Sequence, residues 1–182
     1  ASQELARRDG ARMKEIDLLT YAAKDARDEA ITAEYEANKA KAAAEELIKY
    51  GAAYITALRS RFMDEPVDAM LYLITAALGF AALENTFFLI KPLADGNFLQ
   101  GILTGNLRFI GATLLHTVSS ATIGGAMALS FYRHKRIRHE YLSTGIVLAT
   151  ALHALFNFLI IQTTEDSLLL IFGFIWLGVI GL

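Results

Sequence analysis

Residues 67–90 read VDAMLYLITAALGFAALENTFFLI, an apolar stretch with Asp68 near its start and Glu84 deep inside it. A helix that crosses the hydrocarbon core of a bilayer needs about 20 such residues. Because unpaired backbone groups are not tolerated in lipid, the expected structure is an α-helix. The stretch therefore predicts a membrane-spanning helix.

Four other stretches of the chain are also apolar. Two are long enough to span a bilayer, one is short and interrupted by charges, and one runs to the last residue: 109–132, 141–161, 42–58 and 167–182. Residues 11–50 are rich in Ala, Glu and Lys, a composition that favours helix. The predicted fold class is all-α, a polytopic transmembrane helical bundle with a polar N-terminal helix.

Charge is distributed unevenly along the chain. The 182 residues carry a net charge of -2 and no cysteine, which argues against a nucleic-acid binder and excludes disulfides, thiolate metal sites and a cysteine nucleophile. Residues 1–50 hold nine Lys/Arg and eleven Asp/Glu out of 17 and 19. We therefore expect a charged helical segment at 1–41, solvated or interfacial, and a membrane-embedded core at 42–182. Because residue 182 lies inside an apolar run, we expect this core to be truncated at its C-terminus.

The loops between the apolar stretches predict an orientation. Residues 133–139 read RHKRIRH, and the loop after residue 58 carries Arg59 and Arg61, whereas the loop at 162–167 is acidic. Since basic loops face the cytoplasm, these two are expected on that side of a multi-pass integral membrane protein.

Several polar side chains interrupt the predicted spans: Glu45, Glu46, Lys49, Glu84, His116 and His153, with Asn85 and Asn157 beside them. A charged group costs about 2.5–3.5 kcal/mol at the centre of a span, so its retention needs a reason. Counted from the charged residue at the cytoplasmic border of each helix, Glu45, Glu84, His116 and His153 lie 14, 16, 17 and 13 residues in. At about 1.5 Å per residue, all four sit roughly 20–25 Å from that side. This alignment predicts one shared site nearer the outer face.

Two hydrolytic schemes suit these residue types. In one, Zn²⁺ is bound by three side chains and a further glutamate is the general base: Glu84, His116 and His153 as ligands, Glu45 or Glu46 as base. In the other, a Glu–His pair activates water without a metal, while a histidine and Asn157, one turn after His153, stabilise the oxyanion. The sequence has no HExxH motif, so the zinc scheme lacks local-motif support.

Four segments resemble a known family. EELIK at 45–49 resembles the EExxK motif of PrsW-type intramembrane proteases, and residues 64–85, DEPVDAMLYLITAALGFAALEN, resemble the stretch that follows it there. RFIGATLLHTVSSATIGGA, centred on His116, resembles the third motif of that family. HALFN at 153–157 resembles the HxxxN motif shared with the CAAX-processing Abi membrane proteases. The resemblance covers about residues 42–160.

The resemblance implies a metallo- or glutamic-type protease in a bacterial or archaeal cell membrane. It implies that Glu45 and Glu46 activate water, that Glu84, His116 and His153 are ligands or catalytic partners, and that Asn157 steadies the oxyanion. The implied partners are the lipid bilayer and a membrane-anchored substrate, anti-sigma-factor-like and cut at a first site near the outer face, with no nucleic acid. One departure is that apolar spans normally precede EExxK in the family, whereas residues 1–41 here are highly charged.

Two other classes of protein could use the same polar residues. A proton-coupled transporter would use them as a relay, and its flux would depend on a pH gradient. A membrane scaffold would use them only to hold helices together, so their mutation would lower stability without changing any activity.

Overall fold

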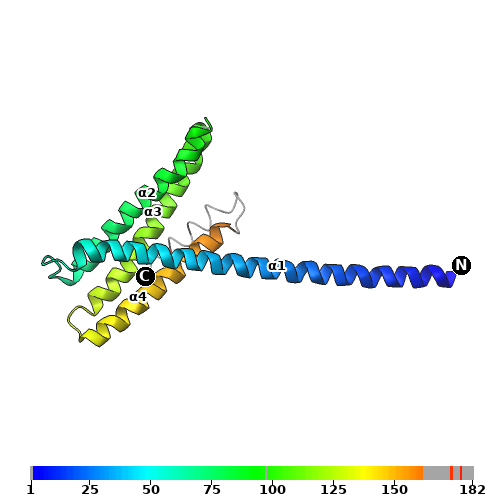
Figure 1. Cartoon of the computed structure of the whole chain (residues 1–182), viewed down its shortest axis with the longest axis horizontal. Helices are drawn as coiled ribbons and strands as arrows, with labels where there is room; N and C mark the ends of the chain where they lie inside the picture. Colours follow the sequence, from blue (N-terminus) through cyan, green and yellow to red (C-terminus); the bar gives the residue numbers. More distant parts are fainter. Residues whose placement is uncertain (1, 97, 162–172, 174–176, 178–182) are drawn as a thin grey trace. The chain divides into compact units, whose positions relative to one another are not determined.

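A computed structural model of the chain describes residues 2–96, 98–161, 173 and 177 (Figure 1). Its elements are four α-helices and a short π-helix: α1 (Ser2–Ala53), η1 (Tyr54–Leu58), α2 (Pro66–Ala94), α3 (Phe98–Leu129) and α4 (Lys135–Ile161). The all-α prediction is therefore confirmed for the described residues. The apolar stretch predicted at 167–182 lies outside them, apart from Gly173 and Leu177.

The chain divides into two compact units, Ala1–Ala37 and Asn38–Leu182. The first unit is helical over its described residues, and its side chains from residue 12 to 37 are exposed except for the partly buried Ile31. Its alanines and long charged side chains favour helix, and the helix interior contains no proline. All the candidate site residues belong to the second unit.

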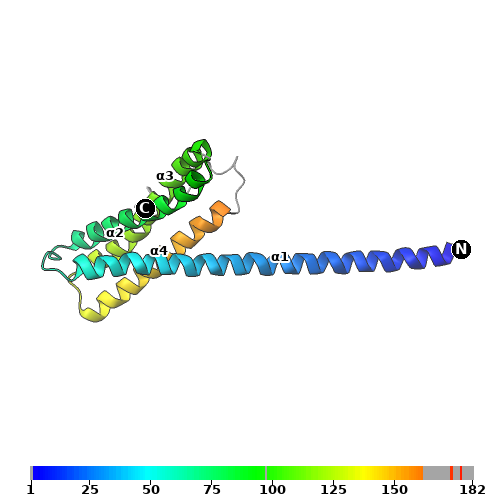
Figure 2. The same cartoon turned by 45° about the horizontal axis from the view of Figure 1, so that its top comes forward.

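Helices α2, α3 and α4 are antiparallel neighbours within the second unit. Near one end Gly124 of α3 lies against Met70 of α2, and farther along Asn85 donates a hydrogen bond to Thr113 Oγ1 at 3.4 Å. Gly145 of α4 lies against Ile123 of α3. Figures 1 and 2 show α2 and α3 side by side along their lengths, with α4 also next to α3. This arrangement places both basic loops at the same end of the unit.

The second unit buries small side chains and exposes large ones. Five buried alanines of α2 and α4 are at most 1% exposed: Ala69, Ala77, Ala81, Ala149 and Ala154. Five large apolar side chains on the same two helices are 46–66% exposed: Leu71, Leu78, Leu83, Val147 and Leu148. Small residues allow helices to approach closely, and large apolar residues on the outside suit contact with lipid.

Among the residues that the structure describes, two helices are long and apolar enough to cross a membrane, Pro66–Ala94 and Lys135–Leu159. By this measure of length and composition, the spans predicted at 67–90 and 141–161 agree with the structure. The segment predicted to span at 109–132 does not meet this criterion of length and hydropathy within the described residues, although α3 forms and ends at Leu129. The reason is chemical, because this part of α3 carries His116 together with several Ser, Thr and Gly residues.

The start of α2 is capped by its own first turn. Pro66 takes the first helical position, where its fixed φ and missing N–H are tolerated. Asp68 Oδ2 accepts hydrogen bonds from the backbone N–H of Asp64 at 3.1 Å and of Glu65 at 2.7 Å. This is the carboxylate half of a capping box, and it fixes where the helix that carries Glu84 begins.

Candidate active site

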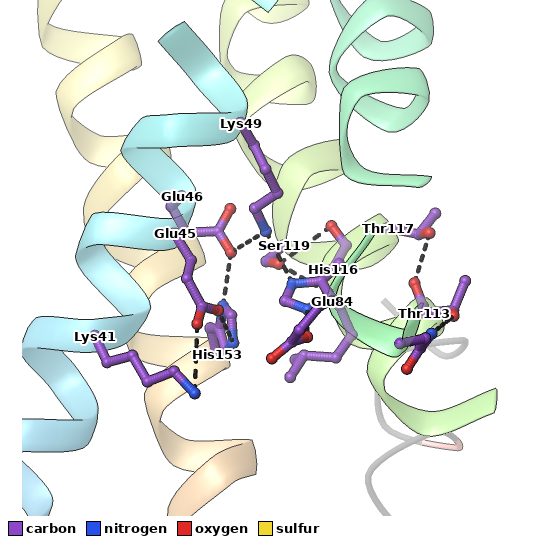
Figure 3. Close-up of polar contacts among 12 residues, drawn as sticks. Lys41, Glu45, Glu46, Lys49, Glu84, Thr113, His116, Thr117, Ser119 and His153 are labelled. Atoms are coloured by element: carbon purple, nitrogen blue, oxygen red, sulfur yellow. Dashed lines mark hydrogen bonds and ion pairs between the residues drawn. The ribbon is translucent and has the colours of Figure 1, made fainter. Parts of the chain in front are cut away.

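The polar side chains predicted at one depth lie together inside the second unit (Figure 3). They come from four helices: Glu45, Glu46 and Lys49 from α1, Glu84 from α2, His116 from α3 and His153 from α4. Four of them, Glu46, Lys49, His116 and His153, are at most 2% exposed. Groups far apart in the sequence therefore form one buried polar cluster.

Both ring nitrogens of His153 face carboxylates of α1. Its Nδ1 lies 2.8 Å from Glu46 Oε1, and its Nε2 lies 3.3 Å from Glu45 Oε2. Consecutive residues of a helix project about 100° apart, so neighbouring glutamates can reach opposite edges of one imidazole. Glu45 also pairs with Lys41 at 3.5 Å, one turn earlier and 60% exposed. The two glutamates therefore share His153, while each also pairs with a different lysine.

The ring of His116 lies between the carboxylate of Glu84 and the amine of Lys49. Its Nε2 is 3.0 Å from Glu84 Oε2, and its Nδ1 is 3.2 Å from Lys49 Nζ. Lys49 Nζ also donates to Glu46 Oε1 at 2.5 Å, which joins the two histidine environments. The rings of His116 and His153 meet edge to face with centroids 4.9 Å apart.

Two buried oxygen atoms have no hydrogen-bond partner in the described part of the chain, Glu46 Oε2 and Ser120 Oγ. Glu46 Oε1 is held by Lys49 and His153, so the orientation of this carboxylate is fixed while Oε2 keeps its capacity to accept a proton or a hydrogen bond. The hydroxyl of the neighbouring Ser119 donates to the Leu115 carbonyl at 2.7 Å, which ties it to its own helix.

The two asparagines lie at the edge of this arrangement. Asn157 follows His153 by one turn of α4 and is partly buried. Within the described residues, no hydrogen bond joins its side chain to the Glu/His cluster. Asn85 is 7% exposed, and its bond to Thr113 braces α2 against α3.

One group of side chains has the composition of a metal site. Candidate ligand atoms of Glu45, His116 and His153 all lie within 4.8 Å of one another. Two imidazoles and a carboxylate are ligands that zinc accepts, and bonds near 2.0–2.1 Å place tetrahedral ligand atoms about 3.3 Å apart. The residues therefore fit zinc if the distances between these ligand atoms shorten by on the order of 1 Å. Glu84, predicted as a ligand, is outside this group and faces His116 Nε2.

Comparison with known proteins agrees with this geometry. Residues 17–180 match the PrsW family intramembrane metalloprotease profile. The chain belongs to this family. Its sequence is 27% identical over 126 residues to Protease PrsW of Geobacillus kaustophilus (strain HTA426), a match that covers 69% of this chain and 52% of that protein. It is 22% identical over 119 residues to Protease PrsW of Clostridioides difficile (strain 630), covering 65% and 48%.

The chain thus spans about half the length of the curated PrsW relatives it matches. No solved structure matches the chain. Membership in an intramembrane family, together with two helices of spanning length, establishes the chain as a membrane protein.

Two contacts of the site were not anticipated from the PrsW motifs. Lys41 pairs with Glu45, and Phe80 packs edge to face on His116 with centroids 5.1 Å apart. Both had a signal in the sequence, since Lys41 precedes Glu45 by four residues and Phe80 precedes Glu84 by four. Such spacing places side chains on one helix face.

Proposed function

We propose that this chain carries the active site of an intramembrane endopeptidase, which hydrolyses a peptide bond of a membrane-anchored protein. The observation that supports the proposal best is the buried cluster in which Glu45 and Glu46 contact both nitrogens of His153. Peptide hydrolysis inside a bilayer needs a water molecule held beside a fixed proton acceptor, and a closed polar cluster supplies that setting.

Glu46 is the proposed general base. Its Oε2 is buried and has no partner in the described part of the chain, while Oε1 is held in place. Oε2 would take a proton from water as the water oxygen bonds to the scissile carbonyl carbon. When the C–N bond breaks, the leaving nitrogen takes the proton held by Glu46 Oε2, which restores the carboxylate, while His153 Nδ1, 2.8 Å from Glu46 Oε1, keeps that carboxylate oriented.

The oxyanion and the metal are finer parts of the proposal. The Asn157 side-chain amide, one turn from His153, would donate to the developing oxyanion. Glu45, His116 and His153 would hold Zn²⁺, which when bound would polarise the scissile carbonyl.

The proposed substrate is a membrane-anchored, anti-sigma-factor-like protein cut in the outer part of the bilayer. Both relatives are named as proteases. Glu84 lies 18 residues after Pro66 and 10 before Ala94, or about 27 Å and 15 Å along α2. The site is therefore nearer the end of α2 that lacks the basic loops, which supports cleavage on that side.

Cleavage of a tagged single-span substrate by the purified chain in liposomes tests the proposal. Glu46→Gln and His116→Ala should each lower the rate by about 100-fold or more, since the first removes the proposed general base and the second removes a proposed zinc ligand. Glu140→Gln and His139→Ala are matched controls, because both residues are exposed at the start of α4, and they should cleave normally.

Equal cleavage by all four variants and the unaltered chain would contradict the proposal. So would a chain that cleaves nothing but supports pH-gradient-driven flux that Glu46→Gln abolishes, because that result assigns the cluster to a proton relay.

A further inference from the structure

Lys49 is the least expected member of the cluster. It is 1% exposed, although a lysine ammonium is rarely buried unless it is paired. Its Nζ lies 2.5 Å from Glu46 Oε1, 3.2 Å from His116 Nδ1 and 5.8 Å from the centre of the Phe80 ring. Figure 3 shows this amine reaching between Glu46 and the ring of His116.

The contacts of His116 select one tautomer of its ring. An ammonium group has donors and no acceptor, so His116 Nδ1 must accept from Lys49 and carries no proton. The proton of the neutral imidazole is then on Nε2, where Glu84 Oε2 accepts it at 3.0 Å. The opposite tautomer would turn an N–H toward an ammonium and leave Nε2 without a proton facing a carboxylate.

This arrangement also assigns the two nitrogens different uses. A histidine that donates one N–H to a carboxylate and offers its other nitrogen is the usual arrangement of an oriented ligand or catalytic group. Here the nitrogen left to offer is Nδ1, and Lys49 Nζ lies in front of it. A divalent cation bound to His116 Nδ1 would have to displace this ammonium.

We infer that Lys49 is a positioning residue that fixes the tautomer of His116 in the metal-free chain and competes with a metal ion for its Nδ1. Glu84 completes the arrangement from the other side of the ring. The inference deepens the proposed function, on which it rests only in treating the cluster as an active site. Both of its readouts are independent of proteolysis, so its failure is distinguishable from failure of the proposed function.

The first readout is the nitrogen spectrum of the ring. The chain has four histidines, so a ¹⁵N-histidine-labelled sample gives few signals, and substitution of the exposed His134 and His139 assigns theirs. The unaltered chain should show His116 protonated on Nε2 alone. Lys49→Met should give a mixture of tautomers, and Lys49→Arg, which keeps a charged donor, should restore the Nε2–H form.

The second readout is zinc affinity, measured by competition with a chromogenic chelator. Lys49→Met should bind Zn²⁺ at least about tenfold more tightly than the unaltered chain, a gain of about 1.4 kcal/mol. Lys135→Met removes an exposed lysine at the start of α4 and should leave the affinity unchanged.

Either of two results would overturn the inference. One is a His116 ring that is protonated on Nδ1 in the unaltered chain, which is decisive even if Lys49→Met fails to fold. The other is a folded Lys49→Met variant, checked by circular dichroism, whose zinc affinity is equal to or weaker than that of the unaltered chain.

Discussion

Glu45 and Glu46 are neighbours in the chain but have different surroundings. Glu46 is fully buried and is bonded to Lys49 and His153. Glu45 is 8% exposed, contacts His153 Nε2 and pairs with the exposed Lys41. The fixed carboxylate suits a general base, and the one grouped with both histidines suits a metal ligand, so the two acids are not interchangeable.

At this scale, zinc affinity distinguishes Glu45 from Glu84 as the carboxylate ligand. Glu45→Gln should weaken zinc binding by about 100-fold or more, because it removes a charged ligand. Glu84→Gln should weaken it by about tenfold or less, because a glutamine oxygen still accepts from His116 Nε2 and a supporting partner contributes about 10–100-fold in full. Equilibrium competition with a chelator measures both.

Glu140→Gln is the matched control for these two variants, since it removes an exposed carboxylate that pairs with Arg136 at 3.2 Å. A larger loss from Glu84→Gln than from Glu45→Gln would instead favour the ligand set expected from the sequence.

At the scale of elements, two glycines set the distances between the helices. A Cβ on Gly124 would lie 2.6 Å from the Met70 Cα, and one on Gly145 would lie 2.8 Å from the Ala126 Cβ and 3.2 Å from the Ile123 Cα. The 2.6 Å and 2.8 Å distances are shorter than real Cβ atoms show, so α2, α3 and α4 pack at distances that favour glycine at these two positions. The same contacts fix the rotation of α3 and α4, and hence where His116 and His153 point.

Gly124→Ala should therefore destabilise the chain by about 1–3 kcal/mol, since the added methyl meets backbone atoms that cannot move aside cheaply. Gly145→Ala should act in the same direction. Thermal unfolding in detergent measures both. Gly125→Ala is the matched control, because its Cβ meets nothing within 4 Å. A loss as large in Gly125→Ala as in Gly124→Ala would show that helix contact is not the cause.

At the scale of the second unit, the basic loops lie at one end of the bundle. The antiparallel order places the loop after η1 and the loop between α3 and α4 together, and the loop between α2 and α3 at the other end. A membrane-embedded bundle with this charge distribution should have its basic end in the cytoplasm.

The absence of cysteine from the sequence makes this orientation easy to measure. In intact cells, an impermeant maleimide should label Asp95→Cys, in the loop between α2 and α3, and should label His134→Cys only after the membrane is opened. Both positions are exposed. Labelling of His134→Cys in intact cells would show that the orientation is the opposite one and that the site is nearer the cytoplasm.

The sequence by itself determined the helical class, the two long apolar spans at 67–90 and 141–161, and the similar level of the polar residues along their helices. These properties are local, because composition sets the tendency to form helix and a constant rise per residue converts position into depth. It also contained enough of the motif pattern around His116 and His153 to indicate the family that the comparison established.

The tertiary structure alone decided which groups meet. Depth does not specify how each helix is rotated about its axis, and that rotation depends on contacts between helices, such as those at Gly124 and Gly145. It is this rotation that turns Glu84 to His116 Nε2, brings Glu45 to His153 and inserts Lys49 between the two histidine environments. Pairing inside the site is therefore a property of packing, because residues at the same depth can still face different neighbours.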